Sequence, residues 1–435
     1  MAGELRCFDA GCGRRFGIRE ELYACPACGS LLEAAYDFAS LKPERLRQVW
    51  RERRLSREPL DQSGVWRYRE MLPFLDEYSC VVSLREGNTP LIEAPAAARY
   101  CGLDGLQFKH QGYNPTGSFK DNGMTAGVAQ ARRLGRAMVA CVSTGNTSAS
   151  MAAYAAAAGM KALIFLPRGQ IASGKLAQAL EYGAVTFQVE ANFDQILALV
   201  RELAEPEGIY LLNSVNPFRI EGQKTIMIEM LEQREWRVPD WIVLPGGNLG
   251  NASAFGKALR EARQVGLIDR LPRLAVIQAE GAAPFHELFR GGERRLRPVE
   301  DPSTLATAIR IGAPVSWPKA LAEVEASGGT VESVSEAEIA DAKAIVGRCG
   351  MGCEPASAAT VAGIRNLAAA GRVGRDQEVV AVLTGHLLKD QDYIYRYHTG
   401  QLEHPRGGRI AGAFANQPLA VPNDPARIAA LLREI

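Results

Sequence analysis

The sequence is defined first by what it lacks. None of its 435 residues belongs to an apolar run of the roughly 18–20 residues that a membrane-spanning helix needs. The opening stretch MAGELRCFDAGCGRRF has no apolar core of a secretory signal. Lys and Arg number 50 against 49 Asp and Glu, and a net charge of +1 disfavours a dedicated nucleic-acid binder. We therefore expect a cytoplasmic globular protein of two or three domains, with no membrane or nucleic-acid partner.

Four of the nine cysteines lie close together near the N-terminus. A reducing compartment disfavours disulfides, so their spacing decides what they do. The first pair has the spacing C-x4-C, and the second pair, C-P-A-C, follows after twelve residues. Two such pairs can bring four thiolates to one tetrahedral centre. The spacing therefore predicts a structural zinc ribbon over residues 1–35, with the ligands Cys7, Cys12, Cys25 and Cys28. Such ribbons can contact nucleic acid, but no basic and aromatic interleaving surrounds this one, which favours a role in folding.

Residues 36–80 are rich in Arg and Glu with helical spacing of Leu46, Val49 and Trp50, and we interpret them as a solvated helical segment without chemistry.

From about residue 80, apolar strand-like runs alternate with helical ones. The predicted strands are 137–143, 161–167, 184–190, 209–214, 241–245, 274–280 and 379–385. Continuous apolar strands alternating with helices predict parallel sheets covered on both faces, with ligands at the carboxyl ends of the strands.

One lysine stands just past a Pro/Gly turn. The segment 114–121, NPTGSFKD, places Lys120 at the expected start of a helix. The positive end of the helix dipole disfavours an ammonium group and should lower the pKa of Lys120, which favours the free amine needed for a Schiff base. A lysine near a turn is otherwise unremarkable, so this motif depends on the others.

Two further turns are suited to anions. Strand 241–245 runs into GGNLGN (246–251), where glycines and a helix start can close backbone N–H groups around a phosphate. The turn matches neither the nucleotide P-loop nor the dinucleotide fingerprint. Strand 137–143 runs into STGNTSAS (143–150), which can cradle a carboxylate, although a Ser or Thr helix cap would need only one of those hydroxyls.

These motifs, together with LLNSVNPFRIEGQKT (211–225), ATAIRIGAPVSW (306–317) and LTGH (383–386), resemble the threonine synthase family of pyridoxal-phosphate enzymes of fold type II. The matches keep their order over about 300 residues. The resemblance implies an α/β fold of two open, mostly parallel twisted sheets with flanking helices, in addition to the small zinc ribbon. It implies a large cofactor domain from residues 81–130 and 216–435, and a small α/β domain from 131–215.

The resemblance also implies roles for individual residues. Lys120 would form the internal aldimine and shuttle protons, Asn146 would contact the ring 3′-oxygen, and Thr384 would hydrogen-bond the pyridine nitrogen and leave it less protonated. The remaining positions fall into three groups. The cofactor phosphate would be held by Gly246, Gly247, Asn248, Leu249, Gly250 and Asn251; the substrate carboxylate by Ser143, Thr144 and Thr147; and the substrate phosphate by Asn213, Ser214 and Arg219.

The expected activity is a lyase reaction that converts O-phospho-L-homoserine and water to L-threonine and phosphate, in a protein that could form a homodimer. An arginine fork beside amide and hydroxyl donors suits a phosphate, whereas the alternative for Arg219 is a surface salt bridge. Asn122, Leu387 and Gln391 depart from the family pattern next to the expected site. Two other functions stay open: an O-phosphoserine-dependent β-replacement enzyme resembling cysteate or cysteine synthase, and a zinc-ribbon interaction protein with a degenerate pyridoxal site.

Overall fold

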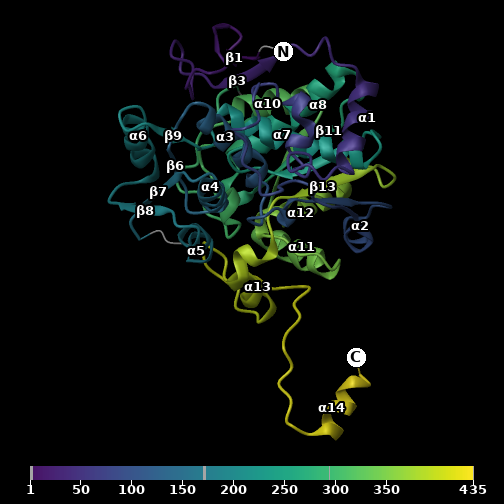
Figure 1. Ribbon diagram of the computed structural model, residues 1–435. Helices are drawn as coiled ribbons and strands as arrows, with labels where there is room; N and C mark the ends of the chain where they lie inside the picture. The colour runs from purple at the N-terminus through teal and green to yellow at the C-terminus, as the bar shows by residue number, and fades with distance from the viewer. Residues whose placement is uncertain (1–2, 170–172, 293, 435) are drawn as a thin grey trace.

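The computed structural model describes residues 3–169, 173–292 and 294–434 and contains three sheets (Figure 1). A small antiparallel sheet with order β2-β1-β3 lies at the N-terminus, and two larger sheets carry the rest of the fold. Both larger sheets are parallel apart from one edge strand, which confirms the fold class expected from the sequence. Among the described residues, no helix is long and apolar enough to cross a membrane.

The larger sheet has six strands in the order β12-β11-β10-β13-β5-β4, and only the edge strand β4 is antiparallel. The strands are Thr330–Val334, Arg273–Ala279, Trp241–Pro245, Val379–Leu383, Gln107–His110 and Leu91–Glu93. One face is covered by α1 (Pro43–Arg54), α7 (Pro217–Gln233), α8 (Gly250–Val265), α9 (Pro284–Gly291) and α10 (Trp317–Ala326). The other face is covered by α2 (Pro95–Cys101), α11 (Glu336–Arg348) and α12 (Pro355–Ala369).

The smaller sheet has four parallel strands in the order β8-β7-β6-β9. They are Val185–Val189, Lys161–Pro167, Met138–Val142 and Ile209–Leu211. Residues of α3 (Lys120–Arg133), α4 (Asn146–Ala157) and α5 (Ser173–Glu181) cover one face, and α6 (Phe193–Ala204) covers the other. Successive residues of β6 point to opposite faces, so Cys141 is buried among one cluster and Val142 among the other, as the two-residue period of a strand requires.

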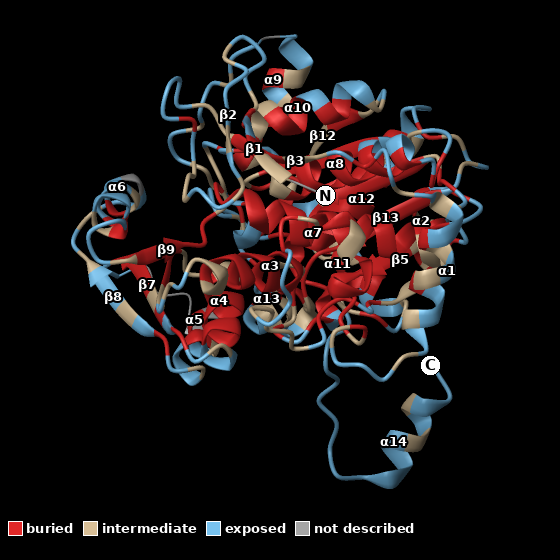
Figure 2. Cartoon of the chain, turned by 45° about the horizontal axis from the view of Figure 1, so that its top comes forward, coloured by how far each residue is buried: buried red, intermediate tan, exposed pale blue. Residues whose placement is uncertain are grey.

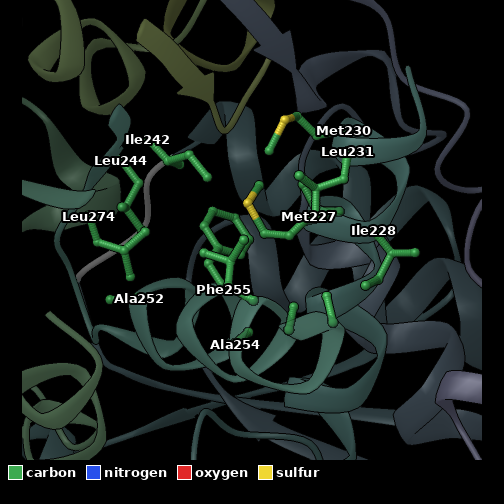
Figure 3. Packing of buried hydrophobic residues seen from close by; sticks show 14 of the residues in the cluster. Met227, Ile228, Met230, Leu231, Ile242, Leu244, Ala252, Ala254, Phe255 and Leu274 are labelled. Carbon is green, nitrogen blue, oxygen red and sulfur yellow. The ribbon is translucent and has the colours of Figure 1, made fainter. Parts of the chain in front are cut away.

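The core of the large domain lies between α7, α8 and the six-stranded sheet (Figure 3). Met227 and Leu231 of α7 pack in the same cluster as Phe255 of α8 and as Ile242 and Leu244 of β10. Figure 2 shows that α3, α7, α8 and α12 are buried along most of their length. The core on which these four helices pack therefore supports the segments at their ends.

The N-terminal sheet, β1 (Gly3–Cys7), β2 (Arg15–Gly17) and β3 (Leu32–Tyr36), packs directly on the large domain. The Lys257 ammonium donates to the Ala34 carbonyl, and Lys319 donates to the Leu32 carbonyl at 2.6 Å. Glu33 accepts from Arg260 at 3.2 Å. Since these lysines are buried, β3 supplies acceptors that the large domain needs.

Several predicted boundaries differ from the structure. The charged segment expected to be helical over residues 36–80 forms α1, which already ends at Arg54, and a 3₁₀ helix, η1, over Trp66–Met71. The strand predicted at 209–214 ends at Leu211, because the Asn213 side chain takes over the backbone pairing of Val142. Helix α7 begins at Pro217, because the Asn216 side chain caps it by accepting from the Phe218 N–H.

The C-terminal part of the chain leaves the body of the molecule. Helix α13 (Gln391–His398) packs on α11, and the chain then extends away to a short, exposed helix, α14 (Pro425–Leu432) (Figure 1). None of the residues of α14 is buried.

Candidate active site

A cavity of about 300 Å³ lies where the two larger sheets face each other. The segments that follow β6, β9, β10 and β13 all contribute to its wall, together with the first residue of α3. These are the carboxyl ends of parallel strands, where side chains and helix N-termini converge on one space. The cavity therefore brings together motifs that are up to about 260 residues apart in the sequence.

Lys120 is the first residue of α3 and lines this cavity. Its ammonium lies 4.1 Å from the centre of the Phe119 ring and makes no hydrogen bond or ion pair with any described residue. Withdrawal from water lowers the pKa of Lys120 to about 7, and the positive charge of Arg219 acts in the same direction. The sequence predicted a lowered pKa from the helix dipole; in the structure, burial is the first cause.

Four buried lysines are bound to acceptors. Lys109 donates to the Thr89 carbonyl at 2.7 Å, and Lys224 donates to Glu221 at 2.6 Å. Lys257 and Lys319 are held by carbonyls of β3. A lysine used in this way is not available as a nucleophile, whereas Lys120 brings an amine without such a partner into the cavity.

The glycine-rich turn 246–251 closes one end of the cavity. Five of its residues line the cavity: Gly247, Asn248, Leu249, Gly250 and Asn251. Gly246 does not line the cavity, and the Gly246 N–H already donates to the Ile277 carbonyl at 2.7 Å. Leu249 has a left-handed conformation with φ of 65°, directly before α8 begins. The first-turn N–H groups of a helix have no partner inside the helix, so this turn presents donors to an anion.

The turn 143–147 forms the side wall contributed by the small sheet. The predicted cradle residues Ser143, Thr144 and Thr147 all line the cavity. Helix α4 is capped by Gly145 without any side-chain cap, so the simple helix-cap explanation of these hydroxyls does not apply. They are left in position to bind a ligand.

Arg219 lies in the first turn of α7 and is only 2% exposed. It donates to the Leu212 carbonyl at 3.0 Å, its Nε has no partner, and it forms no ion pair with any described residue. Burial lowers the pKa of Arg219 to about 10. The surface salt bridge considered from the sequence is therefore absent among the described residues, and a buried guanidinium without a carboxylate favours an anionic ligand.

The two residues expected beside Arg219 are placed differently. Ser214 lines the cavity. The amide of Asn213 also faces the cavity, but its oxygen accepts from the Val142 N–H at 3.2 Å and its nitrogen donates to the Val142 carbonyl at 3.1 Å. Asn213 thus holds the end of β6, and Ser214 and Arg219 stay available to a ligand.

Thr384 directly follows β13 and lines the cavity, and it is part of a network that sequence reasoning missed. Glu354, 1% exposed, accepts from the Thr384 hydroxyl at 3.2 Å and from the Asn146 amide at 3.0 Å. The Ser357 hydroxyl lies 3.0 Å from the Thr384 hydroxyl and accepts from the N–H groups of Thr384 and Gly385. The sequence indicates a helix start at Glu354-Pro355, but its contact with β13 depends on the fold.

The cavity is also lined by residues to which the sequence analysis gave no role. The backbone and side chains of residues 307–311 line the cavity, within the motif ATAIRIGAPVSW that contributed to the resemblance. A Cβ on Gly247 would lie 3.0 Å from the Ala308 carbonyl, so glycine is needed there for close approach. Phe193, exposed at the start of α6, and Gln223 of α7 also line the cavity, and no local signal marks either.

Several buried polar atoms around the cavity have no hydrogen-bond partner among the described residues, and a cofactor that fits the cavity should supply such partners. The side-chain oxygens of Asn146, Gln223 and Asn251 and the Nε of Arg219 are buried without a hydrogen bond. Buried polar atoms are normally paired, so these acceptors and donors point to a polar ligand. A free amine, a backbone phosphate cradle and a terminal hydroxyl in one cavity fit pyridoxal phosphate.

The four N-terminal cysteines also converge. Their sulfur atoms all lie within 4.8 Å of one another, with 3.5 Å between Cys7 and Cys28 and 3.7 Å between Cys12 and Cys25. Four thiolates at about 2.3 Å from a tetrahedral zinc are about 3.8 Å apart. The arrangement is that of a metal site.

Comparisons with known proteins agree with this geometry. Residues 82–385 match the family described as "Pyridoxal-phosphate dependent enzyme". The chain is similar to the threonine synthase of Methanocaldococcus jannaschii, with 47% identity over 392 residues, which cover 90% of this chain and 94% of the relative. It is also similar to the chloroplastic threonine synthase 2 of Arabidopsis thaliana, with 38% identity over 90% of this chain and 77% of the relative.

Solved structures support the fold. The threonine synthase structure from Escherichia coli superposes with a TM-score of 0.69 and 17% identity, covering 98% of this chain and 95% of that one. A fungal L-serine ammonia-lyase from Rhizomucor miehei superposes with a TM-score of 0.61 and 21% identity, covering 72% and 98%. At these identities the likeness shows the fold alone.

Proposed function

The chain belongs to the threonine synthases of the pyridoxal-phosphate-dependent enzyme family, and we propose that it converts O-phospho-L-homoserine and water to L-threonine and phosphate. The observation that carries the substrate assignment is the buried, unpaired Arg219 in the same cavity as the free amine of Lys120. A substrate without a phosphate would leave that guanidinium buried without a counter-charge, which is costly. A phosphorylated amino acid supplies one.

Different residues around the cavity would hold different parts of the cofactor. Lys120 would bind it covalently, the turn 247–251 would hold its phosphate, and Asn146 and Thr384 would contact its ring. When bound, pyridoxal phosphate supplies an electron sink for negative charge that develops on the substrate carbons. Gly246 is left out of the phosphate cradle, because its N–H is already used within the sheet.

The protein's own residues then handle the substrate. The hydroxyls of Ser143, Thr144 and Thr147 would bind the substrate carboxylate, and Ser214 and Arg219 would bind its phosphate. With its pKa near 7, Lys120 is present substantially as a free amine at neutral pH, so it can accept a proton from the substrate and return it. Asn213 would act on this site by positioning the end of β6.

We further propose that the four N-terminal cysteines bind one zinc ion with a structural role. The sulfur spacing supports this, as does the distance in the sequence between Cys28 and the first cavity residue, Phe119. Metal binding would order a sheet that has little apolar core of its own, and this sheet supplies acceptors for Lys257 and Lys319.

The substrate assignment is tested by measuring phosphate release from O-phosphohomoserine and O-phosphoserine with the parent protein and with Arg219→Ala. We expect O-phosphohomoserine to be the better substrate, and the substitution to reduce kcat/KM by a factor equivalent to about 2–5 kcal/mol while the cofactor still binds. Arg219→Lys is the matched control, since it keeps the charge but loses the fork and should fall between the two. Better turnover of O-phosphoserine would favour the β-replacement function.

A further inference from the structure

A second cavity of about 580 Å³ lies apart from the first and shares no lining residue with it. Its wall is built by α11, the loop that precedes Glu354, the 3₁₀ helix η5 (Leu387–Asp390), α13 and the start of the C-terminal segment. Met351, Leu387, Ile394 and Phe414 provide apolar surface. The volume is that of a small-molecule site.

One buried charged side chain in this cavity lacks a direct hydrogen-bond or ion-pair partner among the described residues. Lys343 of α11 is 9% exposed and makes neither a hydrogen bond nor an ion pair with any described residue. Its ammonium lies over the face of the Tyr393 ring, 6.0 Å from the ring centre. Burial lowers the pKa of Lys343, and the charges of Cys353 and Asp390 act in the opposite direction. A buried ammonium that no acceptor contacts directly is costly unless a ligand pairs with it.

The other polar groups of the wall are also donors. His398 accepts from the Asn416 N–H through its Nδ1 at 2.9 Å, so the neutral ring carries its proton on Nε2. Arg348 donates to the Phe414 carbonyl at 3.2 Å and stacks on the Phe414 ring. Among the described residues, no Asp or Glu lines the cavity. Two carboxylates lie nearby: that of Asp341 is bound to the Tyr397 hydroxyl at 2.7 Å, and that of Asp390 acts on Lys343 through its charge.

We propose that this second cavity binds a small organic anion, a carboxylate or phosphate ester with an apolar body, whose charge pairs with Lys343. The apolar wall would hold the body, and Arg348 and His398 would add donors at the charged end. The cationic, carboxylate-free lining disfavours an amino acid, because nothing in it pairs with an ammonium. This site is independent of the proposed function, since its residues do not line the first cavity.

Two segments of the second cavity's wall lead directly to residues of the first cavity. Gly352, in its wall, accepts from His110 at 2.8 Å and is two residues before Glu354, while Leu387 is three residues after Thr384. The two segments pair through an isolated bridge between Cys353 and His386. Leu387 is one of the departures from the family pattern, and a Cβ on Gly352 would overlap its side chain. A bound anion should therefore restrict the segments that carry Glu354 and Thr384.

The proposal is tested by isothermal titration of the cofactor-loaded protein with phenylacetate, phenyl phosphate, inorganic phosphate and phenylacetamide, the neutral counterpart of phenylacetate. We expect one of the two aromatic anions to bind at least about tenfold more tightly than both phenylacetamide and inorganic phosphate. Lys343→Met should abolish that preference and should fold well, because it removes an unpaired buried charge. Lys161→Met, on the exposed start of β7, is the control and should bind like the parent.

Two results would overturn the proposal. One is equal binding of the aromatic anions and phenylacetamide by the parent protein. The other is loss of anion binding in Arg219→Ala with full retention in Lys343→Met, which would place the anion in the first cavity. The tighter of phenylacetate and phenyl phosphate identifies whether the natural ligand is a carboxylate or a phosphate ester.

Discussion

The Thr384 hydroxyl donates a hydrogen bond to Glu354 across 3.2 Å, between the end of β13 and the start of α12. The Ser357 oxygen already accepts from two N–H groups, so its own proton is directed to Thr384. Thr384 therefore accepts from Ser357, donates to Glu354, and has one lone pair left. A ring nitrogen placed against Thr384 would meet an acceptor.

This leads to a prediction opposite to the expectation drawn from sequence. With pyridoxal phosphate labelled with ¹⁵N in the ring, the nitrogen signal of the loaded protein should be that of a protonated nitrogen. Glu354→Gln should shift it toward the unprotonated position, because an amide can donate to Thr384 and free its proton for the ring. Thr384→Ser keeps the network and should leave the signal unchanged. An unprotonated signal in the parent would contradict the assigned proton positions.

Lys120 should make the cofactor-free protein pH-sensitive. Its pKa is about 7 in the fold and about 10.4 in an unfolded chain, so between those values the unfolded state binds more protons and stability rises with pH. Lys120→Met lacks this proton. By urea unfolding, the variant should be more stable than the parent at pH 7, and the difference should shrink toward pH 10. A difference that is constant with pH would show that the pKa of Lys120 is ordinary.

The same free amine predicts the site of covalent labelling. The loaded protein should absorb visible light, and borohydride reduction followed by peptide mapping should place the pyridoxyl group on Lys120. Lys109 and Lys224 should stay unlabelled, because each is buried and bound to acceptors. A label on either would remove Lys120 from the catalytic role.

The N-terminal cysteines should matter for stability more than for chemistry. Chelation or Cys12→Ser should lower the melting temperature by roughly 5 °C or more while the folded variant retains turnover, because the cavity is built from other segments. Deletion of residues 1–35 should be more severe, since it also removes the carbonyls that accept from Lys257 and Lys319. Zinc content measured by atomic absorption checks the assignment. Cys80→Ser, outside the cluster, is the control.

Much of this protein is determined by local sequence. Parallel strands are predicted by short apolar runs, and β7 and β10 have the predicted bounds. The Cys cluster, the glycine-rich turn and the lysine after the Pro/Gly turn are likewise recognisable, because a few neighbouring residues suffice for each. The placement of those motifs at strand ends then follows from the alternation of strands and helices.

Only the tertiary structure decided how these pieces are used. Asn213 looks like a ligand residue in the sequence, but in the fold its amide pairs with Val142. Glu354 is marked in the sequence only as the start of a helix, yet in the fold it joins Asn146 to Thr384. Charge and hydrogen bonding depend on which groups share a buried space, and contacts between residues 30 to more than 200 positions apart create that space. For the same reason, the free amines of Lys120 and Lys343 could be recognised only after every neighbouring carboxylate had been placed.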